Sequence, residues 1–154
     1  MSYWDWAIEA HGREGVDTAL IELQDADGQC VAYLLWAAWA ASEGRVLDEI
    51  ILAQGAALAR HWEAAATGPL RQVRRALKAS APPIDDEART GLRERVRTAE
   101  FAAERLLMET LERLAPEPDG SAIALGQALF SASSAWDAPV PEAGLKDLAA
   151  LLNV

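Results

Sequence analysis

Apolar residues recur every three or four positions along nearly the whole chain, and no segment alternates apolar and polar residues for long. The first pattern is typical of amphipathic helices, whereas alternation is typical of half-buried strands. Glycines and prolines separate the segments, because glycine tolerates non-helical backbone and proline cannot continue a helix. The pattern therefore predicts an all-α fold with helices near residues 2–11, 15–26, 30–42, 48–67, 70–79 and 85–114.

Two of these segments stand out by their apolar faces. The segment from Cys30 to Ser42 is apolar on nearly every side, and such a helix has to be central in the fold. The next segment begins at Asp48, and one face of it is expected to be buried: Ile50, Ile51, Gln54, Ala57, Leu58, His61 and Trp62. Gly68-Pro69 is expected to break the chain after this helix.

The longest segment, residues 85–114, carries apolar residues at coiled-coil spacing. They step alternately by four and three positions: Leu92, Val96, Ala99, Ala103, Leu106 and Thr110. This spacing is typical of a helix that packs along a narrow seam. A second row, Leu107, Leu111 and Leu114, widens the seam near its end. The seam could lie inside a bundle or between two subunits, and the second row favours a homodimer.

The composition changes after residue 114, where three residues indicate a linker: Pro116, Pro118 and Gly120. Two weaker helices are expected beyond it, at about 121–133 and 142–152. We therefore expect a compact bundle of about six helices over residues 1–114 and a helical C-terminal extension over 115–154. Helices this short are marginal in water, so both are expected to dock on the bundle or on a second subunit.

Acidic residues outnumber basic ones. The 154 residues include 24 Asp and Glu against 14 Lys and Arg, which gives a formal net charge of −10. This balance argues against nucleic-acid binding and against adsorption to anionic membranes, since both need basic surface. A single cysteine, Cys30, excludes an intramolecular disulfide, and neither a signal peptide nor a membrane-spanning run is visible. A soluble, cytoplasmic protein is expected.

Catalytic motifs are not visible in the chain. There is no G-x-S-x-G, P-loop or G-x-G-x-x-G sequence, and His11 and His61 lack the spacing of a zinc-binding helix. The sequence therefore indicates no catalytic residue, no cofactor and no metal site. His61 is interpreted as a core histidine with Gln54 as a partner. The alternative is a Trp-lined pocket for a small molecule near the Arg71–Lys78 helix, with Gln54, His61, Trp62 and Trp39 as its residues.

The sharpest feature is a cluster of cations on the fifth helix: Arg71, Arg74, Arg75 and Lys78. At 3.6 residues per turn they share an arc of about 100°, while Leu70, Val73 and Leu77 occupy another. Arginine binds carboxylates and phosphates through paired hydrogen bonds. We expect at least one of these arginines to pair with an acid of the first four helices. The remaining cations are expected to bind an unknown protein partner or a small anionic ligand.

Three blocks of sequence resemble a known family. The first consists of Trp4, Gly15-Val16, Ala19, Leu20, Leu23-Gln24, Gly28, Val31, Leu34-Leu35 and Trp39; the second of Trp62, Pro69-Leu70-Arg71, Arg74-Arg75 and Leu77-Lys78; the third of Leu92-Arg93 and Val96. Over residues 4–114 the chain resembles a family of small proteobacterial proteins known only as a domain of unknown function. That family usually has a tyrosine where this chain has His11. The resemblance supports one domain over this range and implies no activity.

These observations favour a cytoplasmic binding or adaptor protein without catalytic machinery. The alternative is a small-molecule-binding protein or an enzyme. An exposed apolar patch would favour the adaptor, whereas a cavity with a charged residue facing it would favour the small-molecule alternative.

Overall fold

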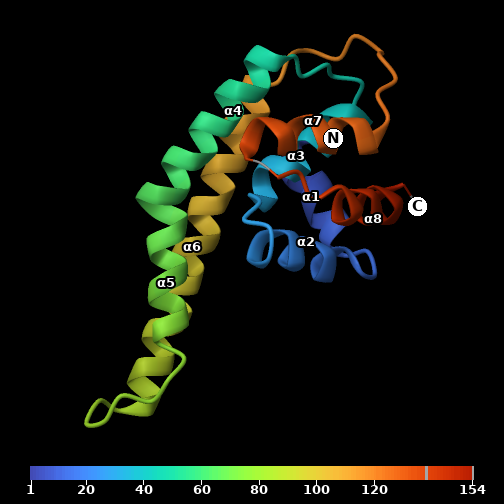
Figure 1. Ribbon diagram of the computed structural model, residues 1–154. Helices are drawn as coiled ribbons and strands as arrows, with labels where there is room; N and C mark the ends of the chain where they lie inside the picture. The colour runs from blue at the N-terminus through green and yellow to red at the C-terminus, as the bar shows by residue number, and fades with distance from the viewer. Residues whose placement is uncertain (138, 154) are drawn as a thin grey trace. The chain divides into compact units, whose positions relative to one another are not determined.

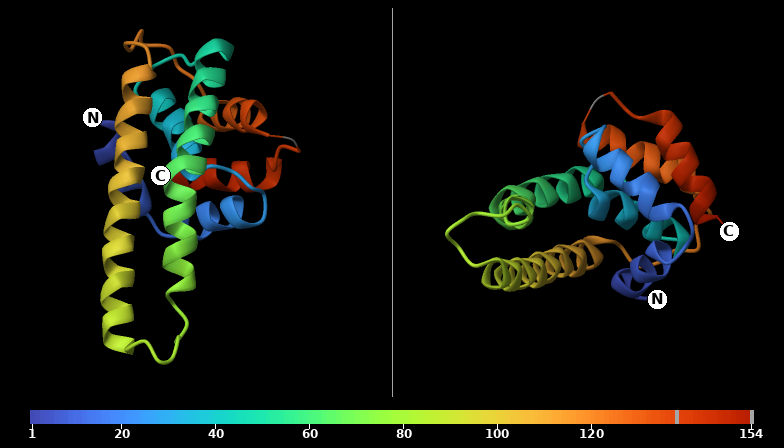
Figure 2. Two further views of the ribbon diagram at one scale, coloured as in Figure 1. Left: turned by 90° about the vertical axis from the view of Figure 1, so that its left-hand side faces the viewer. Right: turned by 90° about the horizontal axis from the view of Figure 1, so that it is seen from below.

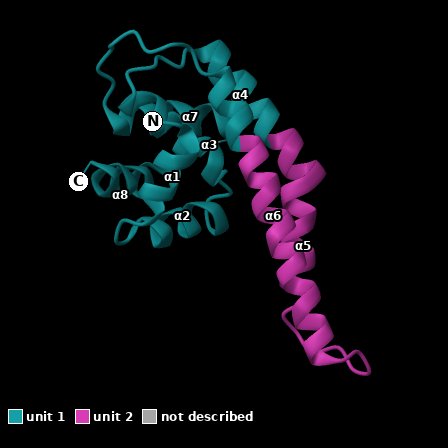
Figure 3. Cartoon of the chain, turned by 180° about the vertical axis from the view of Figure 1, so that it is seen from behind, with its two compact units in different colours: residues 1–59, 108–154 teal, residues 60–107 magenta. Residues whose placement is uncertain are grey.

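The computed structural model describes residues 1–137 and 139–153, and the regular elements in this range are helices (Figure 1). In chain order they are α1 (Tyr3–His11), α2 (Val16–Asp25), α3 (Val31–Ser42), α4 (Glu49–Trp62), the π-helix η1 (Glu63–Thr67), α5 (Gly68–Ala76), α6 (Asp86–Leu114), α7 (Leu125–Trp136) and α8 (Glu142–Leu152). The predicted all-α fold with a helical C-terminal segment is confirmed. The chain forms two compact units: unit 1 is residues 1–59 with 108–154, and unit 2 is residues 60–107 (Figure 3).

Helix α3 lies at the centre of unit 1, as its all-round apolar sequence predicts. Every residue from Tyr33 to Ala41 is buried, because α1, α2 and α7 pack against this helix. The Tyr33 ring lies 5.8 Å from the Trp36 ring and 5.7 Å from the Trp136 ring, measured between centroids. Such aromatic pairs contribute about 0.5–1.5 kcal/mol beyond the area they bury. The core of unit 1 therefore combines aromatic side chains on and around α3 with many buried leucines and alanines.

The two helices of the C-terminal segment belong to unit 1. α7 packs along α3, and α8 packs against α2 and α7 (Figure 2). The Trp136 indole N–H donates to the Gly28 carbonyl at 2.9 Å, and Arg13 donates to the Leu152 carbonyl at 2.5 Å. These contacts supply the docking that such short helices need. The division into domains at residue 114 stays a prediction, since the compact units follow other boundaries.

The buried face of α4 differs from the predicted one. The residues that it buries are mostly small: Leu52, Gly55, Ala56 and Ala59. Gln54 and His61 are exposed, so the interpretation of His61 as a core histidine is wrong. The reason is the close approach of α3. A Cβ atom on Gly55 would lie 2.5 Å from Trp36, and the Tyr33 hydroxyl donates to the Leu52 carbonyl at 2.8 Å. Small residues on α4 make room for these rings.

Gly68-Pro69 does not break the helix, contrary to the prediction. A π-helical turn over Glu63–Thr67 carries the chain from α4 into α5 without a gap. In an α-helix, the Pro69 ring would clash with the carbonyl four residues earlier. The wider π turn, in which the Gly68 N–H bonds to the Glu63 carbonyl, avoids this clash. Glycine is needed at position 68 because a Cβ atom there would lie 2.6 Å from the Glu63 oxygen.

Unit 2 is an antiparallel helical hairpin, with η1 and α5 on one arm and α6 on the other (Figure 2). The least exposed positions of α6 in this unit follow a stripe shifted by one residue from several predicted seam positions: Arg89, Arg93, Val96, Glu100, Ala103 and Leu107. Leu92 and Leu106 of the predicted seam are about half exposed. The seam prediction is therefore only partly right. It follows apolar residues alone, whereas three of these least exposed positions carry charged side chains.

Candidate functional site

A buried carboxylate lies in the seam of the hairpin. Glu100 on α6 is 7% exposed, and it accepts hydrogen bonds from two nitrogens of Arg74 on α5, Nε and Nη2, the latter at 3.3 Å. The Nε atom of Arg71 lies 3.6 Å from the same carboxylate, and its Nη1 donates to Glu63 at 3.2 Å. We call Glu63, Arg71, Arg74 and Glu100 the charged cluster. It links the two arms of unit 2.

The charges in this cluster compensate each other. Hydrogen bonding to Glu100 raises the pKa of the Arg74 guanidinium above its ordinary value, against the opposing effect of burial. Two parallel N–H···O bonds from one guanidinium add geometric specificity as well as energy. They join the turn of α5 that carries Arg74 to the turn of α6 that carries Glu100. The charged cluster therefore favours this register of the two arms.

The pairing agrees in part with the sequence analysis. Glu63 lies in the predicted fourth helix, so the Arg71–Glu63 pair is the expected contact with an acid of the first four helices. Glu100, which pairs with both arginines, is not among the residues that the sequence singled out. Glu100 is the residue after Ala99 of the predicted seam, and it is not included because that seam is traced through apolar residues alone. Arg75 and Lys78 are exposed.

A groove of about 560 Å³ lies beside the charged cluster, and we call it the charged groove. It is lined by Arg74, Glu94, Arg97, Thr98, Glu100, Phe101 and Glu104. Phe101 is 52% exposed, and Arg97 lies 3.6 Å from Glu94. Phe101 is not among the residues that the sequence singled out. The signal that could have revealed it is a large aromatic residue on α6 that belongs to neither apolar row.

The other predicted site residues lie in different surroundings. Trp39 is fully buried in unit 1, where its Nε1 donates to the Met1 carbonyl at 3.1 Å. Trp62 is partly buried in unit 2, where its Nε1 donates to a carbonyl of α6 at 2.8 Å. Each indole is thus bonded to backbone within its own unit. The pocket formed by Gln54, His61 and these two tryptophans stays a prediction.

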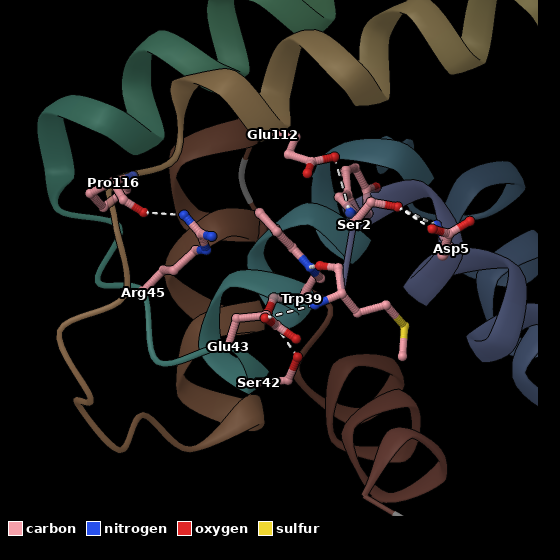
Figure 4. A network of polar contacts seen from close by, with 10 residues as sticks. Ser2, Asp5, Trp39, Ser42, Glu43, Arg45, Glu112 and Pro116 are labelled. Atoms are coloured by element: carbon pink, nitrogen blue, oxygen red, sulfur yellow. Dashed lines mark hydrogen bonds and ion pairs between the residues drawn. The ribbon is translucent and has the colours of Figure 1, made fainter.

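A polar network in unit 1 surrounds Arg45, which follows α3 (Figure 4). Arg45 Nη1 donates to the Pro116 carbonyl at 2.6 Å, and its guanidinium carbon lies 5.0 Å from the centre of the Trp39 ring. Nearby, the Met1 amino group lies 3.2 Å from Glu43. This network joins the end of α3 to the segment that follows α6.

The chemistry of the remaining candidates is limited. Among residues 1–137 and 139–153, no three His, Cys, Asp or Glu side chains gather into a metal-binding arrangement. In the same range, no helix has the length and apolar character needed to cross a bilayer. The Nδ1 atom of His11 lies 2.5 Å from Asp17 on an exposed surface, and Cys30 is buried.

Comparison with known proteins identifies the family. Residues 2–111 match the family described as "Protein of unknown function (DUF2390)". The match contains the charged cluster and the charged groove, whereas α7 and α8 lie beyond it. No curated protein and no solved structure matches the chain. Because the match covers well over half of the residues, the chain belongs to this DUF2390 family.

Proposed function

We propose that this protein is a non-enzymatic binding protein that captures an acidic segment of a partner protein at the charged groove. The observation that carries the proposal is Phe101, a large aromatic side chain that is half exposed among charged residues. Aromatic residues and arginines are enriched at protein interfaces. An aromatic ring also buries a large area while losing little conformational entropy, since it has only two side-chain torsions.

Contacts within unit 2 already hold the arginines that line the groove, and this favours binding with little reorganisation. Arg74 is held by the buried carboxylate of Glu100, and Arg97 lies close to Glu94 on the same helix. The lining residues of the groove lie on α5 and α6, and the charged cluster links these two helices. A surface that is already in place pays less ordering entropy on association than a flexible one.

Two exposed cations that follow Arg74 in the chain select the partner's charge. Arg75 lies on α5 and Lys78 lies two residues beyond its end; both are exposed, and neither belongs to the charged cluster. Neither lines the groove itself, and a partner carboxylate that extends beyond Arg74 along this arm would meet them. The net charge of −10 does not prevent this, because screening at physiological salt limits exposed charges to a range of about 8 Å.

A peptide-display selection against the purified full chain tests the proposal. We expect the selected peptides to combine Asp or Glu with a large apolar residue, since the groove offers cations beside an aromatic ring. Binding of one selected peptide is then measured by fluorescence anisotropy. Phe101→Ala and the double substitution Arg75→Glu, Lys78→Glu should each weaken it at least roughly tenfold, because each removes one kind of contact.

Matched controls come from unit 1. Ile21 is an exposed apolar residue and Lys146 an exposed cation, so Ile21→Ala and Lys146→Glu should leave peptide binding unchanged. Selected peptides that lack acidic residues, or that bind the Phe101→Ala variant as well as the parent chain, would contradict the proposal.

A further inference from the structure

A second cavity lies wholly within unit 1, and it differs from the charged groove in chemistry. Its volume is about 370 Å³, and its lining includes Arg45, Ser121, Gln127, Ala128 and Ser131 beside aliphatic side chains. Arg45 is the charged residue in this otherwise neutral lining. The remaining residues are aliphatic or carry a hydroxyl or amide group. A volume of a few hundred Å³ with few polar groups is typical of small-ligand sites.

Arg45 is held in place without an acidic partner. Its Nη1 donates to the Pro116 carbonyl at 2.6 Å, and its guanidinium lies 5.0 Å from the centre of the Trp39 ring. The Trp39 indole is fixed in turn by its bond to the Met1 carbonyl. Among the described residues, Arg45 forms no ion pair, and its buried Nε has no hydrogen-bond acceptor. Such an uncompensated guanidinium is unusual in a protein that has ten acids in excess.

The wall of the cavity is built by the segment after α6. The Asp119 N–H donates to the Gly44 carbonyl at 3.0 Å, and the Asp119 side chain accepts from the Ser121 N–H at 2.9 Å. Gly44 has a φ of 68°, and an added Cβ atom would lie 3.4 Å from the Gly120 Cα atom. The segment that reads as a linker in the sequence therefore packs against the α3–α4 turn and brings Ser121 to the cavity.

We propose that this cavity binds a small organic monocarboxylate with an apolar body. A carboxylate matches the guanidinium of Arg45, which has donors left beyond the one used by Pro116. The hydroxyl and amide groups of Ser121, Gln127 and Ser131 can complete its hydrogen bonding, and the aliphatic lining covers the carbon chain. A single cation in an acidic unit does not neutralise a doubly charged phosphate. This site is independent of the charged groove.

Isothermal titration calorimetry of the full chain with hexanoate tests the proposal, with 1-hexanol and inorganic phosphate as comparison ligands. We expect saturable one-to-one binding of hexanoate. Hexanol should bind at least roughly tenfold more weakly, because it lacks the charge that pairs with Arg45. Phosphate should also bind more weakly, since it has no apolar body.

Two variants locate the site. Arg45→Gln should lower hexanoate affinity at least roughly tenfold, whereas Arg113→Gln, at an exposed arginine of the same unit, should not. If Arg45→Gln does not fold, Ala128→Leu fills the cavity and leaves Arg45 in place; it should abolish hexanoate binding while the melting temperature is kept. Absence of saturable hexanoate binding, equal binding of phosphate, or unchanged hexanoate affinity in Ala128→Leu would each overturn the proposal. Peptide binding at the charged groove is unaffected by either variant, so failure of one site is distinguishable from failure of the other.

Discussion

The two units of this protein are both helical, but they bury different chemistry. In unit 1 the central helix α3 is surrounded by aromatic and aliphatic side chains, and Trp36 and Trp39 are completely buried. In unit 2 a carboxylate occupies the seam, and two arginines from the opposite arm hold it. Apolar burial supplies most of the stability of a domain, whereas buried ion pairs contribute little net stability and penalise any arrangement that leaves them unpaired. The comparison indicates that unit 1 supplies stability and that unit 2 specifies a register.

The sharpest contrast between the units comes from truncating one aromatic residue in each. Trp36→Ala should lower the free energy of unfolding by about 3–5 kcal/mol, because it leaves a large cavity beside α3. Phe101→Ala should change it by less than about 0.5 kcal/mol, since half of this ring is already exposed. Urea denaturation followed by circular dichroism measures both. Similar losses in the two variants would show that Phe101 is a core residue.

The charged cluster gives the next largest effect. Glu100→Ala should cost about 2–3 kcal/mol, because it leaves Arg71 and Arg74 partly buried without their shared carboxylate. Replacing Arg71, Arg74 and Glu100 together by leucine should cost less than this single change, since only Glu63, whose side chain is 33% exposed, then lacks its partner. Glu87→Ala, at an exposed glutamate of the same helix, serves as the control.

The comparison between these variants decides the role of the cluster. If the triple leucine variant is less stable than Glu100→Ala, the charged cluster adds net stability to unit 2, and its role is not mainly to select the register of α5 against α6. Hydrogen exchange adds a second readout, because Glu100→Ala should increase exchange mainly within residues 68–107.

Close packing of α4 on α3 predicts a smaller loss. Gly55→Ala should cost about 1–3 kcal/mol, because the added Cβ atom would lie 2.5 Å from the Trp36 ring. Gly126→Ala is the matched control within unit 1. There the nearest atom is the Ala149 Cβ at 3.9 Å, so the substitution should be neutral or slightly stabilising. Thermal unfolding of both variants measures the difference, and equal melting temperatures would contradict the close approach.

The smallest effect concerns the turn of the hairpin. Hydrogen bonds from the Ser80 hydroxyl and from Arg89 lower the pKa of the Asp86 carboxyl below its ordinary value of 3.8. A carboxyl with a lowered pKa stabilises the folded state at neutral pH, and this contribution disappears as the pH falls through the lowered value. Carbon NMR titration should give a midpoint below 3.8, and Ser80→Ala should raise it. A midpoint unchanged by Ser80→Ala would show that this hydrogen bond does not control the carboxyl.

How much of the fold the sequence predicts depends on the size of the buried side chains. The central position of α3 follows directly from its apolar sequence. The buried face of α4 does not, because the contact uses Gly55 and alanines, and hydrophobicity patterns give small residues little weight. The continuity of α4 into α5 was missed for another reason. Gly68-Pro69 predicts a break because a proline ring clashes with the carbonyl four residues earlier in an α-helix, and hydrophobicity patterns do not reveal the π turn that avoids this clash.

The candidate site was predicted in part. The basic residues of α5 are visible as a cluster in the sequence, and one expected internal ion pair, Arg71–Glu63, is present. The buried partner Glu100 could not be identified from periodicity, because a charged residue in a seam is recognisable only once the opposite arm supplies the counter-charges. The cavity beside Arg45 could not be identified from the sequence, because its lining comes from α3, α4, α7 and the segment after α6, and a single sequence does not show that these segments meet.

The π turn at Glu63–Thr67 makes the facing of α5 depend on the geometry of a single turn. Its hydrogen bonds span five residues in place of four, so it takes up one residue more than an α-helical turn. Each residue of an α-helix advances the chain by about 100° around the axis. If residues 63–67 became α-helical with no change in length, every later side chain of this arm would rotate by roughly that angle, and Arg71 and Arg74 would turn away from Glu100. A deletion that removed the extra residue together with the π geometry would leave both arginines nearly in place. In this arm, a local change of helix type alters the surface more than most changes in residue type.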